Sequence, residues 1–288
     1  MLVSIIIPTY KDWSRLSLCL KALEEQSFPA GEFEIIVINN NPADAIPGNY
    51  HIPANCQIIA EGKVGSYAAR NAGIDLAKGE ILGFTDSDCI PEKDWIANAI
   101  AYLKANPDVS RIAGKIEIFY KSNNPTPAEL YEKVYAFKQE EIVKLGLSVT
   151  GNMFAYKHVF DSVGKFNETL LSGGDYEWSR RAQDGGFKIV FGNNITIKHP
   201  ARDKMADLIK KTKRVVGGDK VTKSEALVDF FISVKPPMTI AKRHFAKYAN
   251  GLSFGQKATV YSIKYYLAVL CSVEKIKIAW GNRELRRE

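Results

Sequence analysis

Short apolar segments alternate with amphipathic segments over the first two-thirds of the chain, and this alternation is the feature that most constrains the fold. The apolar segments are rich in β-branched residues and are predicted to be buried strands, over 3–7, 33–38, 57–60 and 80–85. Amphipathic helices are predicted between them, one after Asp12 and one over 65–77. Apolar strands separated by helices indicate a parallel sheet with helices on both faces. We therefore expect an α/β protein with a mostly parallel central sheet.

The middle of the chain continues this pattern less regularly. The predicted elements are strands over 111–120, 188–191 and 195–198, an extended segment over 148–156, and helices over 126–145 and 175–183. The alternation ends near His199-Pro200. We therefore place the end of the predicted first domain at residue 202.

The remaining residues, 203–288, are predicted to form a basic, helical C-terminal extension. An uncharged run from Tyr265 to Val273 is shorter than the roughly 20 residues that span a bilayer. Two interpretations stay open for this segment: a basic amphipathic helix lying at a membrane surface, or a helical cap packed on the preceding domain.

The chain of 288 residues has a formal net charge of +7 and a pI near 9.0. Such an excess of positive charge indicates an anionic partner: phosphates, nucleic acid or an acidic membrane surface. Simple solubility is an equally direct explanation, and composition does not separate these alternatives.

The four cysteines are far apart in the sequence, and none forms a C-x-x-C pair. This spacing predicts neither a disulfide framework nor a zinc cluster, as is typical of a reducing compartment. The N-terminal apolar run lacks a basic flank and a small-residue cleavage site, so that it is not predicted to be a signal peptide. A cytoplasmic location is the expectation.

Polar residues follow the ends of the predicted strands, where ligands bind in open α/β sheets. Thr9-Tyr10 and Asn39 follow the first two strands, and Asp86-Ser87-Asp88 follows the fourth. Two neighbouring carboxylates are costly to bury unless a cation compensates them. Their oxygens suit a hard divalent ion such as Mg²⁺ or Mn²⁺. A D-x-D triplet is also common in turns and helix caps.

Two further segments carry candidate functional residues. Arg70, among small residues, can meet a phosphate or a nucleobase. Gly173-Gly174 precedes Asp175 at the start of a predicted helix, where the helix dipole stabilises an ionised carboxylate. Asp175 would also serve as a plain N-cap. Trp178 is as consistent with a core residue as with a platform for a sugar ring.

In the order and spacing of these motifs, the chain resembles the family 2 glycosyltransferases of the GT-A fold over about residues 1–200. No single motif is decisive, but their joint order is a specific signal. The matching motifs lie at 3–10, 26–29, 69–73, 86–88 and 173–178.

The resemblance implies a site for the nucleotide of a sugar donor. It places Asn39 where the family has an aspartate that accepts a hydrogen bond from uracil. An asparagine still accepts through its amide oxygen, but it adds a donor and removes a charge. The residues implied at the donor nucleotide are Pro8, Thr9, Tyr10, Asn39, Arg70, Asp86 and Ser87.

The resemblance also implies the catalytic groups. Asp88 and His199 correspond to ligands of a divalent metal, Mn²⁺ or Mg²⁺. Asp175 corresponds to the catalytic base, which takes a proton from the acceptor hydroxyl. The family inverts the configuration of the transferred sugar.

The implied activity is transfer of a sugar from a nucleoside-diphosphate sugar, with uridine diphosphate as the expected nucleotide. The implied acceptor is a glycan or a lipid-linked hydroxyl in cell-surface polysaccharide assembly. The implied location is the cytoplasm, peripheral to the inner face of the cell membrane. An anionic membrane surface is a further expected partner, whereas nucleic acid is not.

Two other functions compete with this one. A metal-dependent nucleotidyltransferase would be expected to carry a glycine-rich phosphate loop after its first strand, but the segment 8–12 contains no glycine. A non-enzymatic basic protein that binds a membrane or nucleic acid would not need carboxylates at two separate sites.

A lysine-rich stretch after residue 203 has three possible roles. The stretch is predicted to close over the diphosphate, to face anionic lipid, or to form a solvated helix. Its basic residues are Lys204, Lys210, Lys211, Lys213, Arg214, Lys220 and Lys223.

Overall fold

A computed structural model describes residues 2–217, 222–235 and 241–281, with the backbone alone for 241–244. The chain divides into two compact units. The first contains the sheet, and the second is helical over most of its described length. The first unit comprises Met1–Glu117, Phe137–Leu170 and Gly174–His199, and the second comprises Ile118–Ala136, Leu171–Gly173 and Pro200–Glu288.

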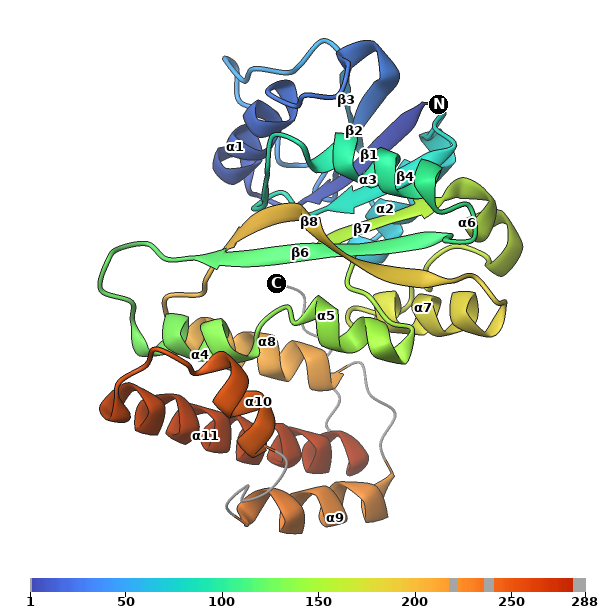
Figure 1. The fold of residues 1–288 in the computed structure, drawn as a ribbon. Coiled ribbons are helices and arrows are strands. Elements are labelled where there is room, and N and C mark those ends of the chain that lie inside the picture. Colours follow the sequence, from blue (N-terminus) through green and yellow to red (C-terminus); the bar gives the residue numbers. More distant parts are fainter. Residues whose placement is uncertain (1, 218–221, 236–240, 282–288) are drawn as a thin grey trace. The chain divides into compact units, whose positions relative to one another are not determined.

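The first unit is built on a mixed sheet with strand order β3-β2-β1-β4-β7-β6-β8-β5 (Figure 1). Strands β3, β2, β1 and β4 are parallel, whereas β7 pairs antiparallel with β4 and with β6, and β5 pairs antiparallel with β8. The predicted α/β class is thereby confirmed. The strands are β1 (Val3–Thr9), β2 (Phe33–Asn39), β3 (Cys56–Ala60), β4 (Ile81–Thr85), β5 (Ile90–Pro91), β6 (Arg111–Phe119), β7 (Asn152–Tyr156) and β8 (Ile189–Pro200).

Helices cover both faces of this sheet, as buried parallel strands require. Successive residues of β1 point to opposite faces: Ile5 packs in one core cluster with Leu16 of α1, and Ile6 packs in the other with Ile74 of α2. The helices of this unit are α1 (Trp13–Glu24), α2 (Ser66–Leu76), α3 (Trp95–Ala105), α5 (Gln139–Ile142), α6 (Lys157–Val163) and α7 (Gly174–Asp184), with 3₁₀ turns at Ala30–Glu32 and Val143–Leu145.

The helix predicted over 126–145 is wrong, because the structure breaks it after residue 135. Phe137 adopts a left-handed backbone conformation, with φ of 49°, which ends the first helix. Two residues later, the amide of Gln139 donates to the carbonyl oxygens of Gly114 and Asn152. Tertiary hydrogen bonds therefore override the local helical preference of this segment.

Four other segments differ from the sequence-based expectation. The two strands predicted over 188–191 and 195–198 are one continuous strand, β8. The extended segment predicted over 148–156 is a strand only from Asn152. Helices α3 and α6 were not predicted.

The second unit is formed mainly by helices, which agrees with the predicted C-terminal helical extension. Two apolar clusters hold them together, one around Leu130 and Val260 and one around Leu208 and Leu267. The helices are α4 (Pro127–Tyr135), α8 (Met205–Gly217), α9 (Lys223–Val234), α10 (Ala241–Tyr248) and α11 (Phe254–Ala279).

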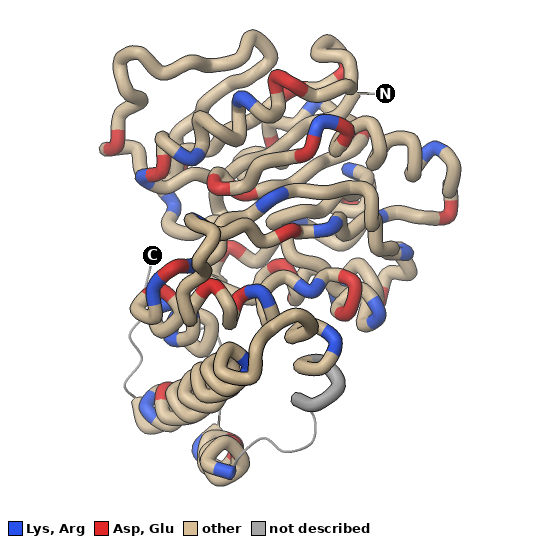
Figure 2. The backbone as a smooth tube through the Cα atoms, turned by 60° about the vertical axis from the view of Figure 1, so that its left-hand side comes forward, with Lys and Arg blue, Asp and Glu red and all other residues tan. Residues whose placement is uncertain are grey.

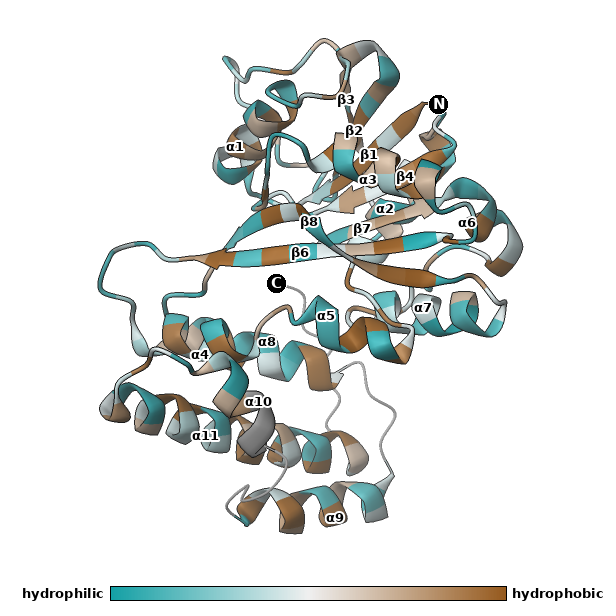
Figure 3. Ribbon diagram, viewed as in Figure 1, coloured by the Kyte–Doolittle hydropathy of each residue, from teal (hydrophilic) through white to brown (hydrophobic). Residues whose placement is uncertain are grey.

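The uncharged run 265–273 lies inside α11, where apolar and polar residues alternate (Figure 3). Val260, Ile263 and Leu267 are buried, which supports packing of this helix within its own unit. None of the helices in the described ranges is long and apolar enough to cross a membrane.

The side chain of Asn152, at the start of β7, connects three neighbouring elements of the first unit. Its amide nitrogen donates to the carbonyl oxygens of Lys115 on β6 and Ile195 on β8, at 2.8 and 2.9 Å. Its amide oxygen accepts from the indole of Trp95 on α3, at 2.9 Å. The adjacent Gly114 makes room for this amide, since a Cβ there would lie 2.3 Å from the nitrogen. One fully buried side chain thus fixes β6, β8 and α3 to β7.

We expect Asn152→Ala to lower the free energy of unfolding by about 3 kcal/mol, because it removes the three hydrogen bonds of a fully buried side chain. Asn98→Ala is the matched control, because its amide also bonds a carbonyl oxygen, that of Asn194, but at the surface. That variant is expected to cost about 1 kcal/mol or less. Denaturant-induced unfolding measures both changes, and equal losses would contradict this account of Asn152.

Candidate functional site

The parallel pairing of β1 with β2 and β4 brings three predicted strand ends to one edge of the sheet. Thr9 at the end of β1 is in register with Asn39 at the end of β2. Residues 86–88 directly follow β4. The polar residues that the sequence placed after these strands therefore gather at this edge.

Arg70 and Asp86 form an ion pair at this edge. Arg70 projects from α2, and its guanidinium nitrogen Nη2 lies 2.5 Å from Oδ1 of Asp86. The side chain of Arg70 is only 5% exposed and that of Asp86 is 32% exposed, so the cation is held inside while the carboxylate reaches solvent. The Nε atom of Arg70 is buried without a hydrogen-bond partner among the described residues. A cationic donor is therefore available beside Asp86.

Asp175 lies at the start of α7 and belongs to the same network of charges. The hydroxyl of Tyr67 on α2 donates to Oδ1 of Asp175 at 3.1 Å, and the backbone N–H of Tyr176 donates to the same oxygen at 3.0 Å. Burial raises the pKa of Asp175, while the charge of Arg70 and these hydrogen bonds oppose that rise. The carboxyl is thus a stronger base than an exposed aspartate.

Tyr67 connects Arg70 to Asp175 and was not predicted as a site residue. The guanidinium carbon of Arg70 lies 5.7 Å from the centroid of the Tyr67 ring. The ring also packs closely on Gly174, where a Cβ would lie 2.7 Å from it. The glycine before Asp175 therefore allows the contact that positions the tyrosine.

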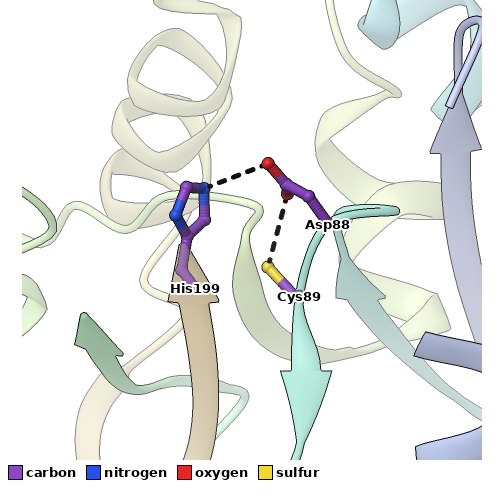
Figure 4. Close-up of side chains that lie close together, drawn as sticks. All are labelled: Asp88, Cys89 and His199. Carbon is purple, nitrogen blue, oxygen red and sulfur yellow. Dashed lines mark hydrogen bonds and ion pairs between the residues drawn. The ribbon is translucent and has the colours of Figure 1, made fainter. Parts of the chain in front are cut away.

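A second cluster contains Asp88, Cys89 and His199 (Figure 4). Nε2 of His199, near the end of β8, lies 3.6 Å from Oδ2 of Asp88. The sulfur of Cys89 lies 3.9 Å from Oδ1 of Asp88. One ligand atom from each residue lies within 4.8 Å of the others, a spacing that could hold a metal ion.

The donor atoms of this cluster fit a divalent metal. Burial raises the pKa of Asp88 and Asp86 adds to that effect, while His199 opposes it, so the ionised carboxylate benefits from a further cation. A thiolate suits softer ions than Mg²⁺ or Mn²⁺, so Cys89 is not expected to be a ligand of a hard ion. A carboxylate and an imidazole, from Asp88 and His199, remain as ligands.

Asp12 and Arg15 also face the D-x-D segment, although neither was predicted as a site residue. Asp12 stands at the N-cap position of α1, but its carboxylate makes no capping bond. It accepts instead from the hydroxyl of Ser87 at 3.3 Å and from Nε of Arg15 at 2.8 Å. Arg15 also lies 3.3 Å from Oδ2 of Asp88. The sequence signal for Asp12 was present, but it is the same as that of an ordinary helix cap.

The residues at the ends of β1 and β2 make different contacts. Both ends of the Asn39 amide bond the following loop: its nitrogen donates to the carbonyl of Asp44, and its oxygen accepts from the N–H of Asn41. Asn39 therefore shapes this loop, and its contact with a nucleobase stays a prediction. The buried hydroxyl of Thr9 has no partner among the described residues, while Pro8 and Tyr10 are half-buried.

Trp178 is a core residue rather than a sugar platform. It is fully buried, stacks on Phe160 with ring centroids 4.2 Å apart, and donates its indole N–H to the carbonyl of Gly164. Glu177, one residue before it, forms an ion pair with Arg181 at 2.7 Å. Both side chains thus stabilise α7 and its contacts.

The lysine-rich stretch contributes to the second unit through specific ion pairs. Lys211 and Arg202 both contact the buried Glu132, at 3.2 and 2.9 Å. Lys213 lies 3.9 Å from Glu274. Lys220 lies outside the described residues. Figure 2 shows basic and acidic residues interspersed along the chain, and a contact of this stretch with diphosphate or lipid stays a prediction.

Comparison with known proteins identifies related sequences. The chain matches the family model described as Glycosyl transferase family 2 over residues 4–163. It is 35% identical over 225 residues to glycosyltransferase AglE of Haloferax volcanii, covering 75% of this chain and 72% of AglE. It is 24% identical over 225 residues to a dolichyl N-acetyl-alpha-D-glucosaminyl phosphate 3-beta-D-2,3-diacetamido-2,3-dideoxy-beta-D-glucuronosyltransferase of Methanococcus voltae, covering 73% and 70%.

Solved structures with low sequence identity share the fold. The mannosyltransferase PcManGT from Pyrobaculum calidifontis, in complex with GDP-Man and Mn²⁺, aligns with a TM-score of 0.60 at 16% identity, over 97% of this chain and 86% of PcManGT. S. aureus TarS 1–349, in complex with UDP-GlcNAc, aligns with a TM-score of 0.56 at 17% identity, over 98% and 92%. The chain therefore belongs to glycosyl transferase family 2 and is a glycosyltransferase with the GT-A fold.

Proposed function

We propose that this enzyme transfers a sugar, with inversion, from a nucleoside-diphosphate sugar to a hydroxyl of a glycan or lipid-linked acceptor in cell-surface polysaccharide assembly. The observation that supports this proposal is the connected set Asp86, Arg70, Tyr67 and Asp175. It joins a buried cation, suited to a phosphate, to a basic carboxylate, suited to a hydroxyl proton.

The donor is proposed to bind at the strand ends through the residues predicted from the sequence. The related folds support a nucleotide sugar, since TarS is complexed with UDP-GlcNAc and PcManGT with GDP-Man. We propose uridine diphosphate as the nucleotide and test guanosine diphosphate beside it, because the Asn39 amide is engaged by its own loop. The proposed donor residues are Pro8, Thr9, Tyr10, Asn39, Arg70, Asp86 and Ser87.

Asp88 and His199 are proposed to hold the divalent metal, Mn²⁺ or Mg²⁺. A nitrogen ligand is tolerated better by Mn²⁺ than by Mg²⁺, which prefers an all-oxygen shell. The bound metal would offset the charge that develops on the diphosphate leaving group.

Asp175 is proposed to act as the general base. Its carboxylate accepts the proton of the acceptor hydroxyl as that oxygen forms a bond to the anomeric carbon of the sugar. The bond from that carbon to the diphosphate oxygen breaks on the opposite face, which inverts the configuration. Arg70 places positive charge where the leaving group becomes more negative.

The acceptor and the location are proposed from the relatives and the charge of the chain. The Methanococcus voltae relative is named for a dolichyl-linked sugar phosphate, which supports a lipid-linked acceptor. We propose a cytoplasmic enzyme at the inner face of the membrane, where a net charge of +7 favours an anionic surface. Nucleic acid is not a proposed partner.

Nucleotide binding is expected to depend on metal through Asp88. In calorimetric titrations, UDP should bind more tightly with Mn²⁺ than without it, and Asp88→Ala should weaken the Mn²⁺-dependent binding by at least about tenfold. Cys89→Ala is the matched control, because this neighbour is not expected to be a ligand. A loss in Cys89→Ala as large as in Asp88→Ala would contradict the proposed ligand set. Tighter binding of GDP than of UDP would reject the proposed nucleotide.

The base is tested by its rate and by its pH dependence. We expect Asp175→Asn to lower kcat by about 10²–10⁴-fold with nucleotide binding retained. Burial raises the pKa of Asp175, and the Tyr67 hydrogen bond opposes that rise by favouring the ionised form. Tyr67→Phe should therefore raise this pKa further. The carboxylate is then protonated, and therefore inactive as a base, at a higher pH than in the wild type. The acidic limb of the kcat–pH profile moves to higher pH.

Tyr176→Phe is the control for this shift, because Tyr176 reaches Asp175 through its backbone N–H, which the substitution retains. Its profile should match that of the wild type. Full activity in Asp175→Asn, or an unmoved acidic limb in Tyr67→Phe, would reject the assigned roles of these residues.

A further inference from the structure

The helical second unit contains a cavity of about 440 Å³, a size typical of small-molecule sites. All of its lining residues belong to this unit, on or next to α4, α8, α9 and α11. We call it the helical-unit cavity. Its walls include the apolar groups of Tyr131, Tyr135, Val216, Leu267 and Ala268.

Three lysines line the helical-unit cavity, and two of them form ion pairs with carboxylates. Lys211 contacts the buried Glu132 at 3.2 Å, and Lys275 contacts Asp229 at 2.7 Å. Lys264, on α11, has no ion pair with any residue in the described ranges. Its ammonium nitrogen lies 5.0 Å from the centroid of the Tyr135 ring.

Lys264 is therefore a partly desolvated cation beside an aromatic face. Burial lowers the pKa of Lys264, which reflects the cost of keeping the ammonium away from water. A cation–π contact offsets only part of that cost. An anion that entered the cavity would offset more of it, because a charged hydrogen bond is strengthened where water is excluded.

The apolar part of the remaining wall favours an apolar body on the same ligand. Leu267 is buried among the apolar residues Leu208 and Ile263, and Ala268 is the next residue along α11. A free inorganic anion would gain nothing from these apolar groups, whereas an alkyl chain would remove them from water.

We propose that the helical-unit cavity binds an amphiphile with one apolar chain and a phosphate head group, the head group contacting Lys264 and the chain lying against Leu267 and Ala268. This site stands independently of the proposed transferase chemistry, because it is defined by binding rather than turnover. The phosphate-bearing chain can be a soluble amphiphile or part of a membrane lipid.

The test uses the full chain and dodecyl phosphate below its micelle-forming concentration. Calorimetry should show saturable binding that Lys264→Met weakens by at least about tenfold, since this variant keeps the stem and removes the charge. Lys257→Met, at an exposed position of the same helix, should bind like the wild type. Ala268→Phe, which fills the cavity, should also lose binding, and circular dichroism checks that each variant is folded.

Two further arms separate the sources of the ligand. Flotation with phosphatidic acid vesicles that is lost in Lys264→Met supports a membrane lipid. Binding of dodecyl phosphate without such flotation supports a soluble amphiphile. Equal binding by wild type and Lys264→Met would overturn the proposal. So would inorganic phosphate binding as tightly as dodecyl phosphate, or no binding of dodecyl phosphate up to millimolar concentration.

Discussion

The buried amide of Asn152 is the interaction on which the arrangement of the first unit depends. β7 runs antiparallel to the strands before it, and Asn152 at its start is in register with Thr85, the last residue of β4. The amide then bonds carbonyl groups of β6 and β8. Thr85, which ends the parallel half of the sheet, is thus paired with Asn152, whose hydrogen bonds hold the antiparallel half together. The position of Asp86, the next residue after Thr85, is therefore set by this junction.

The same junction explains how residues distant in the sequence reach one site. β8 is held to the sheet by the Asn152 bond to Ile195, and four residues later it carries His199 toward Asp88. Arg70 comes earlier in the sequence. It lies on α2, which packs on β1 and β2, and it reaches Asp86 from there. Charged side chains inside a folded unit need partners or hydrogen bonds. Here the partners come from separate elements, so that the fold must form before the charges are matched.

The sequence predicted the strand ends well, because apolar strands followed by polar residues are a local pattern. In this way Asn39 and residues 86–88 were predicted to lie at strand ends, where the structure has them. Tyr67 was not found, since an aromatic residue within a helix usually belongs to the core. The break at Phe137 also escaped prediction, because the bonds of Gln139 that impose it come from residues distant in the chain. Local patterns therefore predicted most of the strands and helices of the first unit, whereas tertiary hydrogen bonds determined features such as the helix break at Phe137.

The buried or half-buried cations of the two units differ in how their charge is compensated. In the second unit, Lys211 and Arg202 share the carboxylate of the buried Glu132. In the first unit, Arg70 is matched by Asp86 but keeps a buried Nε donor without a partner among the described residues. Lys264 has an aromatic ring and no carboxylate among those residues. Since desolvated charge is costly, this incomplete compensation is the physical basis that the two proposed binding sites share.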